Sequence, residues 1–270
     1  MPPHPLPEPD PQPDRPLDRP AVLAALQARI RRLERSGGAA AEAAPIPLCA
    51  AIDRHLPGGG LARAGVHEVM AADPGAAAGF CAMALARTEG TVLWIAAEPD
   101  AWPPGLSRFG LSAANLVLVQ ARRPADALWA MEEALRCPGV AGALLVQAEV
   151  DMTAARRLQL AAEAGGALGL LLRPDAEAEQ GSPADTLRPR GSGQAASVAL
   201  TRWRVGALAG AGGGRHALGD PRWQLELLRC RGGRPQSWQA TWQPAAGELR
   251  VEGAEEAEAD QPPARRRVLR

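Results

Sequence analysis

The sequence predicts an α/β fold with a central, mostly parallel sheet covered by helices on both faces, followed by an antiparallel C-terminal extension. Between residues 66 and 173, short runs of Val, Leu and Ala alternate with segments of helical spacing. Continuously apolar strands are typical of a sheet buried on both faces, and helices between strands make the strands parallel. After residue 195, three strand-like runs follow one another without a helix, which favours antiparallel pairing.

The expected elements follow in chain order, and local residues define several of their ends. Strands are predicted at 66–71, 91–97, 115–120, 142–147, 167–173, 197–205, 222–230 and 237–243, and helices at 76–87, 124–137 and 153–163. Pro124 suits the first turn of its helix, and Asp151 is a good cap for the helix that follows it. Pro174 ends a strand, and Gly232-Gly233 marks a tight hairpin turn.

The regions that flank this core differ from it in composition. We expect a disordered Pro-rich tail at 1–20, a linker at 36–45, a core domain at 46–245 with a flexible loop at 174–194, and a disordered charged tail at 246–270. Residues 21–35 form one amphipathic helix in this interpretation, with its apolar stripe at Leu23, Leu26, Ile30 and Leu33. That stripe packs either on its own domain or on another protein.

Composition excludes several kinds of chemistry. All 30 basic residues are arginine, so the chain has no lysine for a Schiff base or for a phosphate-binding loop. They balance 30 acidic residues. The four cysteines have no metal-ligand spacing, and neither do His55 and His67, so no metal site and no cofactor are expected. With no leader peptide and no apolar span visible, we expect a cytoplasmic protein without membrane contact.

The turn after the first strand is the place for nucleotide phosphates in an α/β NTPase, because backbone amides at a helix N-terminus face the anion. Here Gly75 and Gly79 are only three residues apart, and Phe80 and Cys81 replace the lysine and the magnesium-binding hydroxyl. Gln147 follows a strand where a metal-binding aspartate is expected. The sequence therefore predicts a degenerate nucleotide site and no catalytic residues.

Glu98, at the end of the strand 91–97, has two interpretations. A carboxylate there could activate a water molecule. Without a lysine or a cation to hold phosphate, it is more simply a solvated acid at the end of a strand.

Several sequence blocks resemble known proteins in the same order. Segments 52–69, 94–101, 109–120 and 195–204 are similar to the RecA recombinase core. More specifically, LPGGGLARAGVHEV (56–69), DALWAMEEALR (126–136), RRLQLAAEAGG (156–166) and PRWQLELLRCRGGRPQSW (221–238) resemble the ImuA family, the RecA-like members of the bacterial inducible mutagenesis cassette.

This resemblance implies a RecA-like fold and a non-catalytic accessory function in SOS-induced translesion DNA synthesis and mutagenesis. The implied partners are an ImuB-like relative of Y-family polymerases, an error-prone C-family DNA polymerase, and RecA. Two alternatives stay open: a divergent ATP-binding RecA paralogue with residual DNA-linked ATPase activity, and a SulA-like inhibitor of cell division.

DNA contact, direct or through partners, is a further hypothesis. Arginines gather between residues 188 and 234, and those of interest are Arg188, Arg190, Arg229, Arg231 and Arg234. They could hold phosphates while Trp203, Trp223, Trp238 and Trp242 stack on bases. Alternatively, the arginines form a polymerase-binding surface or a solvated face, and the tryptophans belong to the core.

Overall fold

The structure is a computed structural model that describes residues 44–98, 101–147, 149–175, 198–211 and 219–253. The predicted tail at 1–20, the helix at 21–35 with Leu23, Leu26, Ile30 and Leu33, and nearly all of the linker at 36–45 lie outside these residues. So does the loop from 176 to 194, with Arg188 and Arg190.

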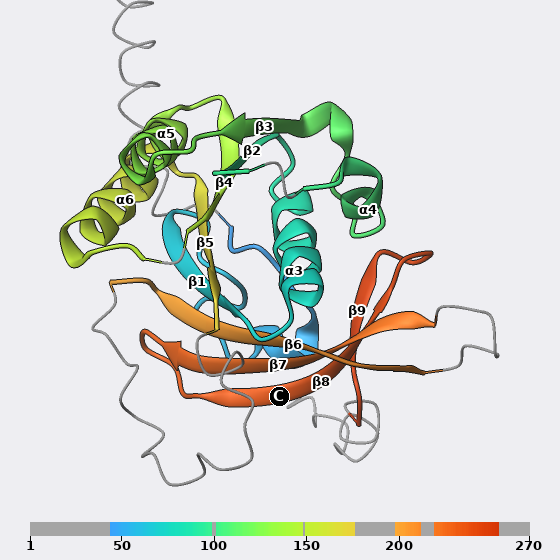
Figure 1. The fold of residues 1–270 in the computed structure, drawn as a ribbon. Helices are drawn as coiled ribbons and strands as arrows, with labels where there is room; N and C mark the ends of the chain where they lie inside the picture. The colour runs from blue at the N-terminus through green and yellow to red at the C-terminus, as the bar shows by residue number, and fades with distance from the viewer. Residues whose placement is uncertain (1–43, 99–100, 148, 176–197, 212–218, 254–270) are drawn as a thin grey trace, which may run out of the picture. The chain divides into compact units, whose positions relative to one another are not determined.

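One nine-stranded sheet organises the described residues (Figure 1). Its strands are β1 (Gly65–Ala71), β2 (Thr91–Ala96), β3 (Leu116–Gln120), β4 (Val140–Val146), β5 (Leu168–Pro174), β6 (Thr201–Ala211), β7 (Asp220–Cys230), β8 (Gln236–Gln243) and β9 (Glu248–Val251). They lie in the order β3-β2-β4-β5-β1-β6-β7-β8-β9. Neighbours from β3 to β6 pair in parallel, and those from β6 to β9 are antiparallel. This confirms the predicted fold class, with β6 joining the two halves.

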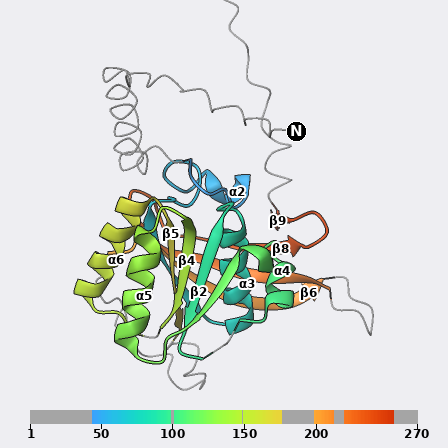
Figure 2. The ribbon, with the colours of Figure 1, turned by 90° about the horizontal axis from the view of Figure 1, so that it is seen from above.

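Helices cover both faces of the parallel half, as the buried strands predicted. The helices are α2 (Ala50–Asp53), α3 (Pro74–Ala86), α4 (Pro103–Ser107), the 3-10 helix η2 (Ala113–Asn115), α5 (Pro124–Arg136) and α6 (Met152–Gly165). Figures 1 and 2 show α3 on one face of the sheet and α5 with α6 on the other. None of the helices in the described residues is long and apolar enough to cross a membrane.

Two predicted boundaries at the antiparallel end are wrong. The strand expected at 197–205 begins only at Thr201 and continues to Ala211, because its second half pairs with β7. Residues 248–251, expected to belong to a disordered tail, form β9, which pairs with β8 and buries Leu249 in the core. Residues 248–251 are too short and too polar to predict a strand from the sequence. The strand forms because it pairs with β8.

The core beneath α3 is built around aromatic rings. Phe80 on α3 lies with its ring centroid 5.5 Å from Trp203 on β6 and 6.3 Å from Trp223 on β7. Trp238 lies 5.9 Å from Trp203, and Phe109 lies 6.1 Å from Trp242. The four tryptophans of the antiparallel strands β6, β7 and β8 are buried, so the core interpretation of these residues is confirmed and the stacking of bases on them is wrong.

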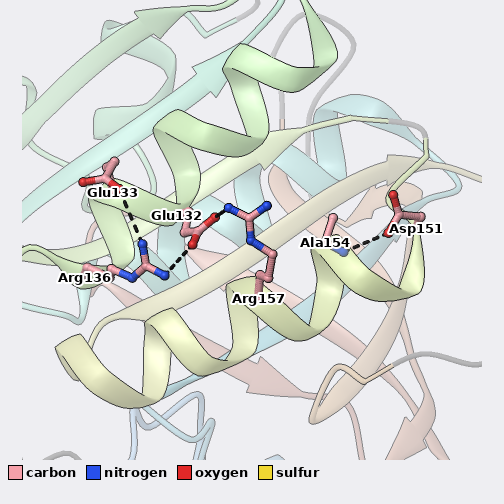
Figure 3. Close-up of polar contacts among 6 residues, drawn as sticks. All are labelled: Glu132, Glu133, Arg136, Asp151, Ala154 and Arg157. Atoms are coloured by element: carbon pink, nitrogen blue, oxygen red, sulfur yellow. Dashed lines mark hydrogen bonds and ion pairs between the residues drawn. The ribbon is translucent and has the colours of Figure 1, made fainter.

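The opposite face is held by close packing of α5 on α6. A Cβ added at Gly165 would lie 1.9 Å from the Leu135 carbonyl oxygen, so this contact requires glycine. Glu132, which is buried, accepts from Arg157 of α6 at 2.5 Å and also pairs with Arg136 of its own helix (Figure 3). The buried carboxylate is thus satisfied by two guanidinium groups, and it joins the two helices.

Candidate functional site

The connection from β1 to α3 is the part of the fold where a nucleotide site was predicted to be degenerate. Ligands of open α/β sheets bind at the carboxyl ends of the parallel strands. Here only Ala72 and Asp73 separate β1 from α3. Their backbone N–H groups donate to the Val205 carbonyl on β6, at 3.0 and 3.1 Å. The connection is therefore short, and its amides are already used within the sheet.

The N-terminus of α3 is closed by the protein's own carboxylate. Asp73 is the N-cap, and its Oδ1 accepts from the Ala76 N–H at 2.7 Å. The next residue is Pro74, which has no N–H, and the Ala77 N–H donates to the Asp73 carbonyl at 3.0 Å. Two amides at the helix start are therefore already bonded, one to the side chain and one to the backbone carbonyl of Asp73.

Phe80 and Cys81 lie in the second turn of α3, deep in the core. The phosphate-binding motif places its lysine where the loop enters the helix. The helix here begins at Pro74, two residues earlier than predicted, so position 80 is too far along it to reach its N-terminus. Burial raises the pKa of the Cys81 thiol far above its ordinary value. Neither side chain can reach a phosphate or a cation.

The two glycines of the degenerate motif have different surroundings. Gly75 is exposed in the first turn of α3. Gly79 is buried, and a Cβ added there would lie 2.8 Å from the ring of Phe109. Gly79 thus allows an aromatic ring to pack against the helix, and it does not line a phosphate loop.

Glu98 and Gln147 lie at the ends of β2 and β4 but have separate partners. Glu98 forms an ion pair with Arg122 at 3.4 Å and accepts from Gln120 at 3.3 Å, in exposed positions. The Gln147 side chain donates to the Glu149 carbonyl at 2.7 Å. Among the residues that the structure describes, no three His, Cys, Asp or Glu side chains form a group able to hold a metal ion. The surroundings of Glu98 fit the solvated strand-end acid.

Buried polar pairs on the strands were missed by sequence reasoning. Glu68 on β1 accepts from Arg202 on β6 at 2.6 Å, and Asp175 accepts from Arg204 at 2.5 Å. At an exposed position, Arg222 on β7 pairs with Glu252 at 2.6 Å. Part of the arginine-rich segment therefore neutralises carboxylates within the fold. The cross-strand spacing that makes these pairs appears only once the register is known.

His67 belongs to another buried network. Its Nε2 lies 2.9 Å from the Ala62 carbonyl and must therefore donate, and its Nδ1 accepts from the Thr201 hydroxyl at 2.7 Å. The Thr201 oxygen in turn accepts from Trp203 Nε1 at 2.8 Å. This geometry fits a neutral imidazole, and desolvation lowers the pKa of His67 to about 4. The network ties β1 to β6 and has no free ligand atom.

Arg229, Arg231 and Arg234 are exposed at the turn between β7 and β8, where the Gly232-Gly233 hairpin was predicted. Gly232 adopts a φ of 80°, which favours glycine. The turn follows Cys230, which pairs with Thr201 at the start of β6. These arginines therefore lie at the opposite end of the parallel strands from the start of α3, so the structure does not bring the two predicted sites together.

Comparison with known proteins identifies the family. The protein ImuA of Caulobacter vibrioides, found in two strains, is 40% identical to this chain over 199 residues, a match that covers 69% of this chain and 78% of the relative. The chain belongs to the ImuA family. No family model matches it.

The fold of this ImuA-family chain is RecA-like. The crystal structure of the RadB recombinase superimposes with a TM-score of 0.53, covering 73% of this chain and 94% of RadB at 12% sequence identity. At that identity the likeness shows the fold alone. The RecA-like fold expected from the sequence blocks is confirmed, and so is the resemblance to the ImuA family.

Removing the Asp73 cap tests whether this carboxylate only closes the helix. We expect Asp73→Ala to lower the free energy of unfolding by about 1 kcal/mol, the usual cost of a lost N-cap, as measured by urea denaturation. Asp151→Ala is the matched control, because Asp151 caps α6 in the same way, accepting from Ala154 at 2.8 Å. Neither variant should acquire ATP-dependent thermal stabilisation. Such stabilisation in Asp73→Ala alone would show that a nucleotide site lies beneath the cap.

Proposed function

We propose that this ImuA-family protein is a non-catalytic accessory protein in SOS-induced translesion DNA synthesis and mutagenesis. In this proposal it is an adaptor that binds an ImuB-like relative of Y-family polymerases, an error-prone C-family DNA polymerase, and RecA. Family membership supports the process, and the RecA-like fold supplies the scaffold. The protein acts in the cytoplasm, where these partners replicate DNA.

One observation carries the non-catalytic part of the proposal: the start of α3 is built as an internal cap instead of a phosphate loop. ATP hydrolysis depends on a cation and a lysine to stabilise charge on the transferred phosphoryl group. The chain has no lysine, Asp73 occupies the helix N-terminus, and Phe80 packs in the aromatic core. A RecA-like sheet with this end closed is best explained as a scaffold.

Exposed apolar side chains support the adaptor function. Most of the large apolar side chains exposed on the described surface lie before α4 and on β3, α5 and α6. They are Trp102, Val117, Leu118, Trp129, Met152 and Leu160. Trp129 is 64% exposed. Tryptophan and methionine are enriched in protein–protein interfaces, so these side chains are available to a protein partner.

Affinity capture tests the adaptor function. Tagged full-length protein is expected to retain the purified ImuB-like protein, the C-family polymerase and RecA. A variant lacking residues 1–35 should lose one of these partners and keep the others, because the predicted apolar stripe at 21–35 offers a separate docking helix. If the full-length protein retained none of the three purified partners, the adaptor proposal would fail.

A nucleotide assay tests the non-catalytic part separately. We expect no ATP turnover above background, with or without single-stranded DNA, and no change in melting temperature with Mg-ATP. A ligand at 100 times its Kd would stabilise the native state by about 2.7 kcal/mol, which a thermal melt detects readily. DNA-stimulated hydrolysis by the purified chain would instead favour the divergent ATPase, with its activating groups elsewhere.

A further inference from the structure

The turn between β7 and β8 packs against the segment that follows α2. An ideal Cβ at Gly232 lies 3.6 Å from the Pro57 ring, and one at Gly233 lies 3.3 Å from the His55 carbonyl oxygen. The His55 ring lies 5.7 Å from that of Trp238 on β8. The Arg231 N–H also donates to the Leu200 carbonyl at 2.8 Å. These contacts hold the turn in one position on the sheet.

This packing gathers three exposed arginines, Arg54, Arg231 and Arg234, which we call the arginine turn. The Arg54 Nε lies 3.4 Å from Nε2 of the adjacent His55, whose ring packs on Trp238. Within the described ranges, no ion pair joins the three guanidinium groups to a carboxylate. Positive charges on segments that pack against each other, without carboxylate partners, add to a local potential that attracts an anionic partner.

The backbone beside the arginine turn is open. Gly58 and Gly59 are exposed with φ values of 82° and 80°, and nothing lies within 4 Å of an ideal Cβ at either residue. Positive φ values and a missing side chain let an anion approach the main chain closely. Exposed main chain and guanidinium forks are together the groups that proteins use to hold phosphates.

We infer that the arginine turn binds the phosphate backbone of nucleic acid. A protein partner would need apolar anchors at the centre of its interface. The large exposed apolar side chains of the described surface lie on other elements, except Leu228 on β7. Arginine suits phosphate because its planar fork forms paired hydrogen bonds.

Binding through this site should be independent of sequence. Trp238, which packs on the His55 ring beside the turn, is buried and cannot stack on a base. Phosphate contacts position a protein on nucleic acid without reading its sequence. The site would therefore place the adaptor on DNA near a polymerase without selecting a target. This inference is separate from the protein partners, so the capture experiment and the DNA experiment can fail independently.

Fluorescence anisotropy with full-length protein tests the inference. The affinity is measured for a labelled single-stranded oligothymidylate and, separately, for a labelled duplex of the same length. We expect binding that weakens with salt. The double variant Arg231→Gln/Arg234→Gln should bind roughly tenfold more weakly or worse, since it loses two charge-assisted contacts to phosphate. On the single strand, its slope of log affinity against log salt should fall by about 1.4, because two phosphate contacts are lost.

The matched control is Arg108→Gln/Arg123→Gln, which removes the same charge from two exposed arginines elsewhere. It should change the affinity less than twofold, and Arg231→Lys/Arg234→Lys should keep most of the salt dependence. Thermal melts of all variants should match the wild type, because the side chains are exposed. Absent binding by the wild type, or an equal loss in the control, would overturn the inference. Preferential binding to polyglutamate would assign the turn to an acidic protein and overturn it too.

Discussion

The substitution Phe80→Lys is expected to unfold the domain, and not to restore ATP hydrolysis, although a lysine directly after Gly79 would resemble a phosphate-binding motif more closely. Phe80 is fully buried among Trp203 and Trp223. Deleting a buried phenylalanine side chain costs about 3–5 kcal/mol, and an ammonium group without a partner adds a further desolvation cost. Together these costs approach the whole stability of a domain, about 5–15 kcal/mol.

Urea denaturation followed by tryptophan fluorescence checks this expectation. Phe80→Leu is the matched control: it keeps an apolar side chain and should remain folded, with a loss of about 1–2 kcal/mol. A Phe80→Lys variant that melts at the wild-type temperature would show that position 80 reaches solvent. Measurable ATP hydrolysis by that variant would show that the start of α3 can still open around phosphate.

At position 80 the residue type could be interpreted from the sequence, but its location in the fold could not. The spacing of Gly75 and Gly79 predicted a degenerate motif, and the replacement of lysine by an apolar ring was visible in the letters. The location of the ring was not, because it depends on where the helix starts. Asp73-Pro74 is a strong helix start, a capping residue followed by proline, and it offered a local signal for the true N-terminus.

The sheet itself was predictable because its strands are apolar on both faces and are separated by helical segments. The strand order and the register were not, since pairing between distant segments leaves no trace in one sequence. The ion pairs of Glu68 with Arg202 and of Asp175 with Arg204 depend on that register. The sequence also presented Arg202, Arg204, Arg231 and Arg234 as one basic segment, and only the structure separates the two that are neutralised in the fold from the two at the turn.

Acidification is expected to destabilise the domain between pH 6.5 and about 4, and His67 should account for about 3 kcal/mol of this loss. The pKa of His67 is lowered from 6.5 to about 4 by complete burial. In that window the unfolded state binds a proton that the folded state does not, so the free energy of unfolding falls as the pH falls. Above pH 6.5 the imidazole is neutral in both states, and the contribution is fully present.

Urea denaturation at a series of pH values separates His67 from the carboxylates, which also titrate in acid. His67→Gln should be less stable at pH 7, because it disturbs the bonds to Ala62 and Thr201, but its stability should fall less steeply between pH 6.5 and 4. His55→Gln, at an exposed histidine, should retain the wild-type slope. If stability fell equally steeply with pH in wild type and His67→Gln, the imidazole would titrate normally. The assignment of a neutral His67 bonded to Thr201 would then be wrong.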